Sequence, residues 1–176
     1  MVGVSFRPFQ RKRRRESSVS LFLEHQFAIN DVHLAAKFRP HPEGVSFRRW
    51  LAFSEPLSKS VSLIPDGYFE TNSQVGIRGA FLEVDLGTES LRVWKRKAEL
   101  YLQLAIGGEF TRLFELNQFR VLVVAPSHRR MNTIRSVVGR STDKIFWFST
   151  FESINRDGFW SPIWFRPRGD QELSLI

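Results

Sequence analysis

The stretch that decides the fold runs from Leu63 to Ala105 and reads LIPDGYFETNSQVGIRGAFLEVDLGTESLRVWKRKAELYLQLA. Inside it, the segment AFLEVDL (80–86) alternates with a period of two, which predicts a strand. Glu83 and Asp85 then share one face of that strand, two residues apart and close to its end. Gly87 ends the strand, so the two carboxylates are expected where the sheet gives way to a loop.

A second strand is predicted just before the first. The segment SLIPDGYF (62–69) has strand character, and its Pro-Asp-Gly sequence marks an edge, a bulge or a bend. If this segment pairs antiparallel with 80–86, Asp66 falls beside Glu83 or Asp85. Three carboxylates that close repel one another unless a cation lies between them. The residues therefore indicate a site for a divalent cation, Mg²⁺ or Mn²⁺, that acts on phosphate; the alternative is that they are ordinary surface acids.

A helix is predicted from Leu91, capped by Thr88 or Ser90. On a helical projection its apolar residues cover an arc of roughly 200°, with Lys97 as the one charge inside that arc. An unpaired buried ammonium group is costly, so Lys97 is expected to meet a carboxylate or to reach a cleft. The alternative is that its side chain extends from the helix flank to water.

Composition narrows the class of protein. The 176 residues suffice for one domain with a sizeable core, and the absence of cysteine excludes disulfides, zinc thiolate sites and cysteine nucleophiles. No apolar run is long enough to span a membrane, and the N-terminus lacks the apolar segment of a secretory signal, which together fit a cytoplasmic location. We expect a basic arm at 1–18, an α/β domain at 19–166 and a polar, mobile tail at 167–176.

The positive charge is concentrated near the N-terminus. The net charge is +8, and the run RKRRR carries +5 of it, on Arg11, Lys12, Arg13, Arg14 and Arg15. Like charges keep such a run from packing, and it could hold a DNA backbone without regard to sequence. A solvated linker or a targeting address are the alternatives. A basic amphipathic helix at 128–140 adds Arg129, Arg130, Arg135 and Arg140, which are expected to face solvent or phosphate.

The remaining elements complete a mixed α/β order. A helix is predicted at 20–38, and strands at 45–53, 119–127 and 144–151, while the aromatic segment 158–165 is expected to pack rather than to stack on bases. Strands separated by helices should run parallel, which gives a mixed central sheet of about five strands flanked by helices. Glu24 on the first helix is a weak metal-ligand candidate, and His25 and His33 are interpreted as a capping or partly buried pair.

Several of these motifs resemble the plasmid replication-relaxation family. The resemblance rests on EHQFAINDVHLAA, Trp50, IPDGYFE, FLEVDLGTESLRVWKRKAELY and VLVVAPSHRRMNTI, and it spans roughly residues 20–150. The spacing Glu-X-Asp-X-Gly-Thr-Glu is its most specific part. That family in turn looks like a branch of the PD-(D/E)XK nuclease-like superfamily. The implied restriction-endonuclease-like core is ordered helix, three strands, helix, strand.

The resemblance also implies roles for individual residues. Asp66 matches the first acid of the superfamily motif and Glu83 matches the second, while Asp85 stands where a lysine is expected. Lys97, on the next helix, could supply that missing charge, and Tyr101 follows it one turn later as a weak candidate.

Two functions are therefore expected from the sequence. The first is a metal-dependent endonuclease or other DNA-processing protein of a plasmid or mobile element, with Asp66, Glu83 and Asp85 on Mg²⁺ or Mn²⁺ and Lys97 on phosphate. The second is a non-catalytic DNA-binding or assembly module on a nuclease-like fold. Either function implies DNA as a partner. A third alternative is a subunit of a larger nucleoprotein complex, with protein partners that order the basic arm. The oligomeric state is left open.

Overall fold

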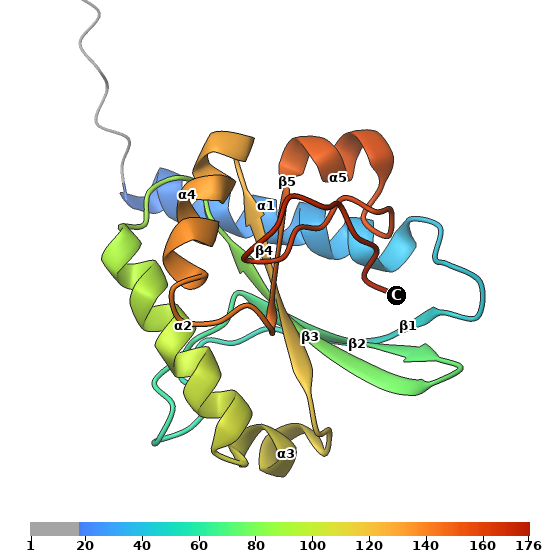
Figure 1. The fold of residues 1–176 in the computed structure, drawn as a ribbon, viewed down its shortest axis with the longest axis horizontal. Coiled ribbons are helices and arrows are strands. Elements are labelled where there is room, and N and C mark those ends of the chain that lie inside the picture. Colours follow the sequence, from blue (N-terminus) through green and yellow to red (C-terminus); the bar gives the residue numbers. More distant parts are fainter. Residues whose placement is uncertain (1–17) are drawn as a thin grey trace, which may run out of the picture.

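The computed structural model describes residues 18–176, so the basic run at 11–15 lies outside the described residues. Five helices and five strands follow one another in this part of the chain. In order they are α1 (Ser18–Phe38), β1 (Ser46–Leu51), β2 (Gly67–Ser73), β3 (Gly76–Val84), α2 (Leu91–Ile106), α3 (Glu109–Phe114), β4 (Phe119–Ala125), α4 (His128–Val138), β5 (Phe146–Thr150) and α5 (Phe151–Asp157) (Figure 1).

The five strands form one mixed sheet in the order β1-β2-β3-β4-β5. The first three strands are antiparallel neighbours, whereas β4 pairs parallel to β3 and β5 pairs parallel to β4. The short turn after Ser73 permits an antiparallel return, while the helices between the later strands bring the chain back for parallel pairing. The mixed sheet predicted from the sequence is confirmed.

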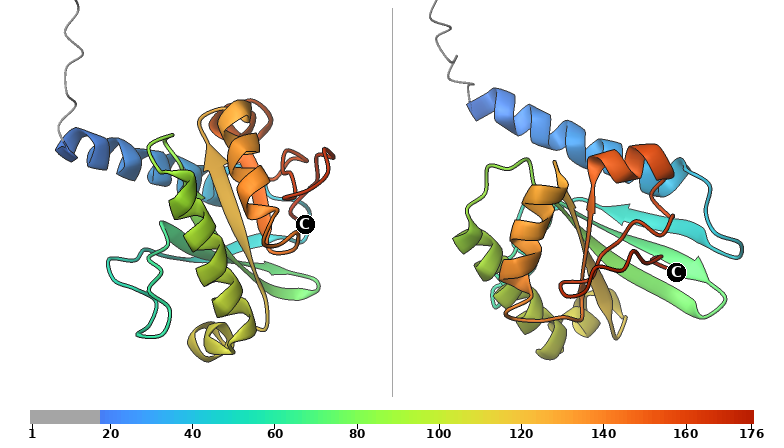
Figure 2. Two further views of the ribbon diagram at one scale, coloured as in Figure 1. Left: turned by 60° about the vertical axis from the view of Figure 1, so that its left-hand side comes forward. Right: turned by 45° about the horizontal axis from the view of Figure 1, so that its top comes forward.

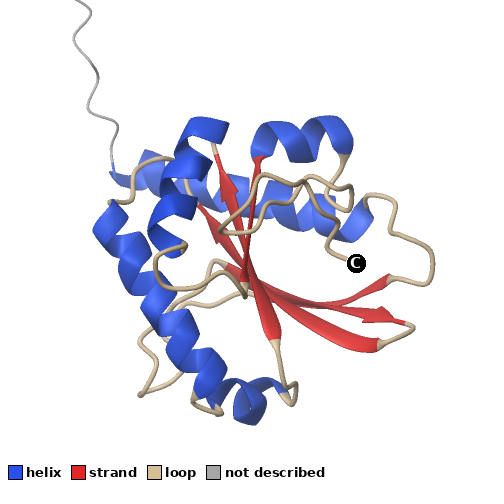
Figure 3. Cartoon of the chain, viewed as in Figure 1, coloured by secondary structure: helices blue, strands red, loops and turns tan. Residues whose placement is uncertain are grey.

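Helices cover both faces of the sheet, which gives three layers (Figures 2 and 3). Helices α2, α3 and α4 pack on one face against side chains that include Phe81, Val121 and Val123. Helices α1 and α5 cover the other face, together with the aromatic segment that follows α5. The alternation of β3 decides which residues face which layer: Glu83 shares a face with Phe81 and therefore points toward α2.

The hairpin of β2 and β3 is longer than the sequence predicts. Strand β3 begins at Gly76 instead of Ala80, and β2 begins at Gly67, one residue after Asp66. The sequence does not predict the full hairpin because it contains polar residues. One of them, Glu70, is buried and accepts hydrogen bonds from Arg48, Arg49 and Tyr68. Gly67 is required at the start of β2, because a Cβ atom there would lie 2.2 Å from the Trp50 ring. That close approach fixes where Asp66 leaves the sheet.

The C-terminal part of the chain also differs from expectation. Helix α5 was not predicted; it starts directly after β5, where the Thr150 side chain accepts a hydrogen bond from the Ser153 amide. Residues beyond 166 pack on the domain, since Leu175 is buried and Leu173 pairs with Trp164, which contrasts with the mobile tail that the sequence suggests. The aromatic segment packs as predicted, with Phe159 and Trp164 fully buried. Within residues 18–176, no helix combines the length and apolarity that crossing a membrane requires.

Candidate functional site

Charged side chains gather at the end of the sheet where β3 finishes. The backbone brings them together because β3 ends beside the start of β2, and because α2 and α4 both begin at this end. The cluster, called here the acid end, consists of His25, Asp66, Glu83, Asp85, Glu89, Trp94, Lys97, Tyr101 and Arg130.

Glu83 lies at the centre of the acid end and is fully buried. Its Oε2 accepts a hydrogen bond from Lys97 Nζ at 2.7 Å, and its Oε1 accepts one from the Tyr101 hydroxyl at 2.5 Å. Burial raises the pKa of Glu83 to about 7 and the negative charge of Asp66 acts in the same direction, while Lys97 and Tyr101 oppose the rise. Burial, with the negative charge of Glu83, also raises the pKa of Tyr101, which keeps its phenol protonated as a donor.

Lys97 is shared by two acids. Its Nζ lies 2.7 Å from Glu83 Oε2 and 2.8 Å from Glu89 Oε1, and its side chain is 16% exposed. Burial lowers the pKa of Lys97, but the carboxylates of Glu83 and Glu89 outweigh that effect and raise it. The ammonium group is therefore cationic at neutral pH and anchored to the buried acid, with one side toward water. The contact between Lys97 and a carboxylate that the helical projection predicts is present.

Asp85 belongs to a second ion pair. Arg130, in the first turn of α4, donates to both oxygens of Asp85 at 2.7 and 2.8 Å, and also to the backbone carbonyl of Glu89. Trp94 Nε1 and the Gly87 amide complete the donors around Asp85. The hydrogen bond to Asp85 raises the pKa of Arg130. Both Asp85 oxygens are thus committed to a bidentate arginine, the strongest common form of ion pair.

Asp66 connects the acid end to α1. Its Oδ2 accepts the Val84 amide at 2.7 Å and lies 3.4 Å from His25 Nε2, which is also 2.9 Å from the Val84 carbonyl. The hydrogen bond to Asp66 raises the pKa of His25 to about 9, against the opposing effect of burial. The imidazolium thus contributes positive charge between a carboxylate and a carbonyl oxygen. Among residues 18–176, the hydrogen bonds and ion pairs of Asp66 engage only Oδ2.

Other residues singled out from the sequence take various places. Glu24 is exposed on α1 and pairs with Ser20, whereas its neighbour His25 reaches the site. Arg129 is exposed at the start of α4, and Arg130 is turned inward to Asp85. Arg135, expected to face solvent or phosphate, is instead buried and donates to the backbone carbonyls of Arg166 and Gly169, because the C-terminal segment covers it.

The sequence does not assign four members to the acid end, namely His25, Glu89, Trp94 and Arg130. Glu89 lies before the cap of α2 at Ser90, eight residues from Lys97, so the spacing of neighbours within a helix does not predict their contact. The pattern of its own helix predicts a surface position for Arg130, because nothing in that helix marks it as paired with a buried acid. The contact of His25 with Asp66 is not predicted, because the two residues are far apart in the sequence and no local pattern links them.

The carboxylates offer a limited set of metal ligands. Within the described part of the chain, no group of three His, Cys, Asp or Glu side chains is arranged to hold a metal ion. Asp66 and Glu83 are neighbours across the strand ends: Gly67 is the partner of Leu82, so continuing that register sets Asp66 opposite Glu83, and the charge of Asp66 acts on Glu83. Two carboxylates fit Mg²⁺, which commonly takes one or two together with water and substrate phosphate. Asp85 fits less well, because Arg130 already neutralises it.

Fold and site together define a three-layer α/β protein with a mixed sheet and a buried acid–base cluster at the strand ends. The chain belongs to the replication-relaxation family, whose model matches residues 5–116. The match covers α1 through α3 and therefore includes all the acid-end residues except Arg130. Membership suggests a role in the replication or relaxation of a plasmid or mobile element, and involvement with DNA. No curated protein and no solved structure matches the chain.

Proposed function

We propose that the chain is a DNA-processing protein of a plasmid or mobile element that hydrolyses phosphodiester bonds with a divalent cation at the acid end. The observation that carries the proposal is the convergence of Asp66, just before β2, with Glu83 from β3 and Lys97 from α2 at one end of the sheet. A restriction-endonuclease-like core belongs to the same proposal, and the observed order α1, β1, β2, β3, α2, α3, β4 supports it with only the short α3 added.

Each of the three residues has a distinct task in this proposal. Mg²⁺ or Mn²⁺, held by Asp66 and Glu83, would supply Lewis-acid polarisation of a phosphate and a more acidic water. Lys97 favours the ionised form of Glu83 against the effect of burial and presents a positive charge toward phosphate. Tyr101 fixes the orientation of the Glu83 carboxylate from the buried side. Asp85 positions Arg130 at the same edge rather than serving as a ligand.

The DNA-binding part of the proposal rests on positive charge outside the acid end. Arg129 is exposed at the start of α4, close in sequence to Arg130, and it is free to contact a phosphate backbone. The run from Arg11 to Arg15 would add sequence-independent affinity. Such contacts hold the duplex and carry no sequence information of their own.

A second candidate function is a non-catalytic DNA-binding or assembly module. The observation that favours it is how completely the acids are paired: Lys97 and Tyr101 occupy Glu83, and Arg130 occupies Asp85. In that case the acid end stabilises the fold and holds α2 and α4 against β3. The two candidates differ in whether the acids are needed for chemistry or only for folding.

Plasmid cleavage separates the two candidates. The purified protein is incubated with supercoiled plasmid and Mg²⁺ or Mn²⁺, and conversion to nicked or linear DNA is followed on a gel. We expect conversion by the parent protein and its loss in Asp66→Asn and Glu83→Gln. Both replacements keep an amide oxygen that can accept the hydrogen bonds of Val84 N–H or Lys97.

Glu70→Gln is the matched control, because Glu70 is a second fully buried glutamate held by a tyrosine and two arginines, away from the acid end. It should lose stability and retain cleavage. Cleavage by Asp66→Asn and Glu83→Gln at the parental rate would overturn the catalytic role. Absence of cleavage by every form, with DNA binding retained, would leave the second candidate.

A further inference from the structure

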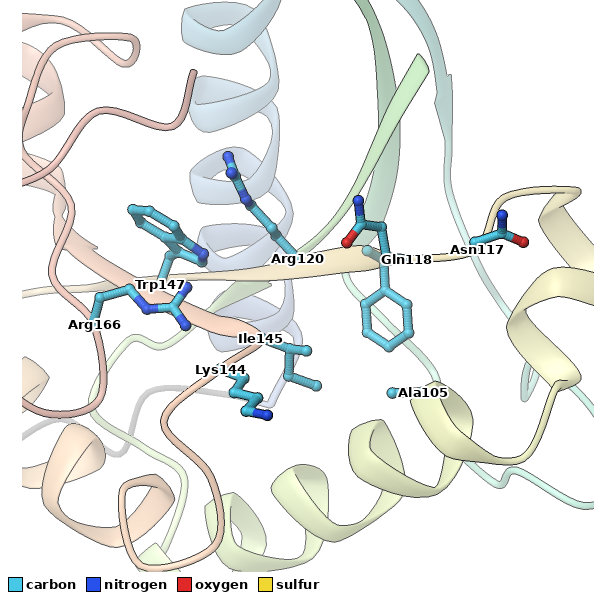
Figure 4. A pocket seen from close by; sticks show the side chains of 9 residues that line it. Ala105, Asn117, Gln118, Arg120, Lys144, Ile145, Trp147 and Arg166 are labelled. Carbon is cyan, nitrogen blue, oxygen red and sulfur yellow. The ribbon is translucent and has the colours of Figure 1, made fainter. Parts of the chain in front are cut away.

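A cavity of about 350 Å³ opens at the other end of the sheet, where β4 and β5 begin and α2 ends (Figure 4). Its wall includes Gln118, Arg120, Lys144, Trp147 and Arg166. An adjoining hollow shares Gln118 and Arg120 and adds Arg78 from the start of β3. This region, called here the basic end, consists of Arg78, Arg120, Lys144, Trp147 and Arg166. Neither hollow has an aspartate or glutamate in its wall.

The cations of the basic end are not neutralised by acids. Within residues 18–176, neither Arg78, Arg120, Lys144 nor Arg166 forms an ion pair. Arg120 and Arg166 instead donate to backbone carbonyls, those of Leu175 and Asp143. Burial lowers the pKa of Arg120 to about 10, and repulsion from Arg78 and Arg166 adds to the effect. Burial lowers the pKa of Arg166, and the negative charge of Asp143 opposes this effect without forming an ion pair with Arg166.

Trp147 provides a donor without an acceptor. It lies between the guanidinium groups of Arg120 and Arg166, at 4.7 and 4.6 Å from its ring centroid. The residue is 8% exposed, and its buried indole N–H has no hydrogen-bond partner among the described residues. Figure 4 shows the indole nitrogen on the side of the ring that faces the cavity. A buried N–H without a partner lowers stability, so the position is suited to an acceptor brought by a ligand.

We propose that the basic end binds a phosphate group. Guanidinium groups and an indole N–H are all donors, and together they match an anion that accepts several hydrogen bonds at once. The side chains of Gln118 and Lys144, which line the same cavity, can add further donors. The phosphate could come from free phosphate or from the backbone of a DNA strand. The site is at the far end of the sheet from the acid end, and its function does not depend on cleavage.

Thermal melting without divalent cations tests this site. Melting temperature is measured against inorganic phosphate and, separately, against a short oligothymidylate, with chloride at the same ionic strength as reference. Because phosphate also stabilises proteins generically, the informative quantity is the difference between variants. Arg166→Gln and Trp147→Phe should each weaken phosphate binding, Arg166→Gln by about tenfold or more. Lys95→Gln, which removes one exposed charge on α2 away from the cavity, should bind as the parent does.

The outcomes separate the source of the phosphate. If oligothymidylate stabilises the parent at lower phosphate concentration than the free ion, and Arg166→Gln loses that gain, the ligand is a DNA backbone. If only the free ion shows the difference between variants, the ligand is a small phosphate compound. The proposal is overturned if neither ligand stabilises the parent, or if Arg166→Gln and Trp147→Phe respond as Lys95→Gln does. Melting of each variant in chloride alone verifies that it is folded.

Discussion

The two ends of the central sheet treat charge in opposite ways. Where β3 finishes, Glu83 is in contact with Lys97, and Asp85 with Arg130. Where β4 and β5 begin, Arg120 and Arg166 flank Trp147, and no acid pairs with them in the part of the chain that the structure describes. The charges of the acid end are paired with one another, whereas the basic end has hydrogen-bond donors that no acidic side chain among the described residues neutralises. The difference indicates that the ion pairs of the acid end contribute to folding, and it is the basis for proposing that the basic end binds an anion from outside.

The largest expected effect concerns Lys97. Lys97→Met leaves Glu83 buried beside Tyr101 without its cation, so unfolding free energy should fall by about 3–5 kcal/mol in urea titrations. The double variant Glu83→Gln/Lys97→Met removes both charges and should recover much of that loss. Lys95→Met on the exposed face of the same helix should change stability by less than about 0.5 kcal/mol. Equal effects at the two lysines would mean that the acid end contributes little to folding.

The next effect is a pH dependence carried by His25. Its folded pKa of about 9 lies above its ordinary value of 6.5, so its stabilising contribution is complete below that ordinary value and is lost as pH rises through about 9. Since 32% of the side chain is exposed, we expect only about 1–2 kcal/mol. Urea titrations in EDTA, compared with His25→Gln, measure the difference. Parallel pH profiles for the two proteins would show that His25 and Asp66 are not coupled.

The smallest expected effect is a gain in stability instead of a loss, and it concerns the basic end. Arg78 forms no ion pair among residues 18–176 and repels Arg120, so Arg78→Gln should leave stability unchanged or raise it by about 0.5 kcal/mol at low salt. Screening should remove the gain at high ionic strength. Melting curves at two salt concentrations measure it. A clear loss of stability at both would show that Arg78 has a structural partner, contrary to the contrast between the two ends.

Much of the acid end follows from local pattern. The alternation of β3 predicts that Glu83 and Asp85 share a face, and the helical projection of α2 predicts that Lys97 turns inward. Each expectation concerns residues of one strand or one helix. There, a period of 2 or 3.6 residues determines the direction in which a side chain points. The parallel pairing of β4 and β5 likewise follows from the helices that separate them.

What the sequence could not provide is the choice of partners across elements. Asp85 pairs with Arg130, which is 45 residues away and reaches it only because β4 lies parallel to β3 and α4 starts beside it. Because Glu70 is charged, the sequence around it predicts a loop, although the residue is buried in the hairpin of β2 and β3. The basic end combines Arg78, Arg120 and Arg166 from three separate segments. No local pattern in these segments predicts that the three side chains lie together. In each case, tertiary contact decides what the local composition leaves open.

The central claim is that Asp66 and Glu83 hold a divalent cation, and thermal melting with Mn²⁺ tests it most directly. An ion that binds only the folded state raises the melting temperature by mass action. The account predicts a rise for the parent protein and for Glu70→Gln, and none for Asp66→Asn, each compared with its own melt in EDTA. No rise in the parent, or an equal rise in Asp66→Asn, would contradict it.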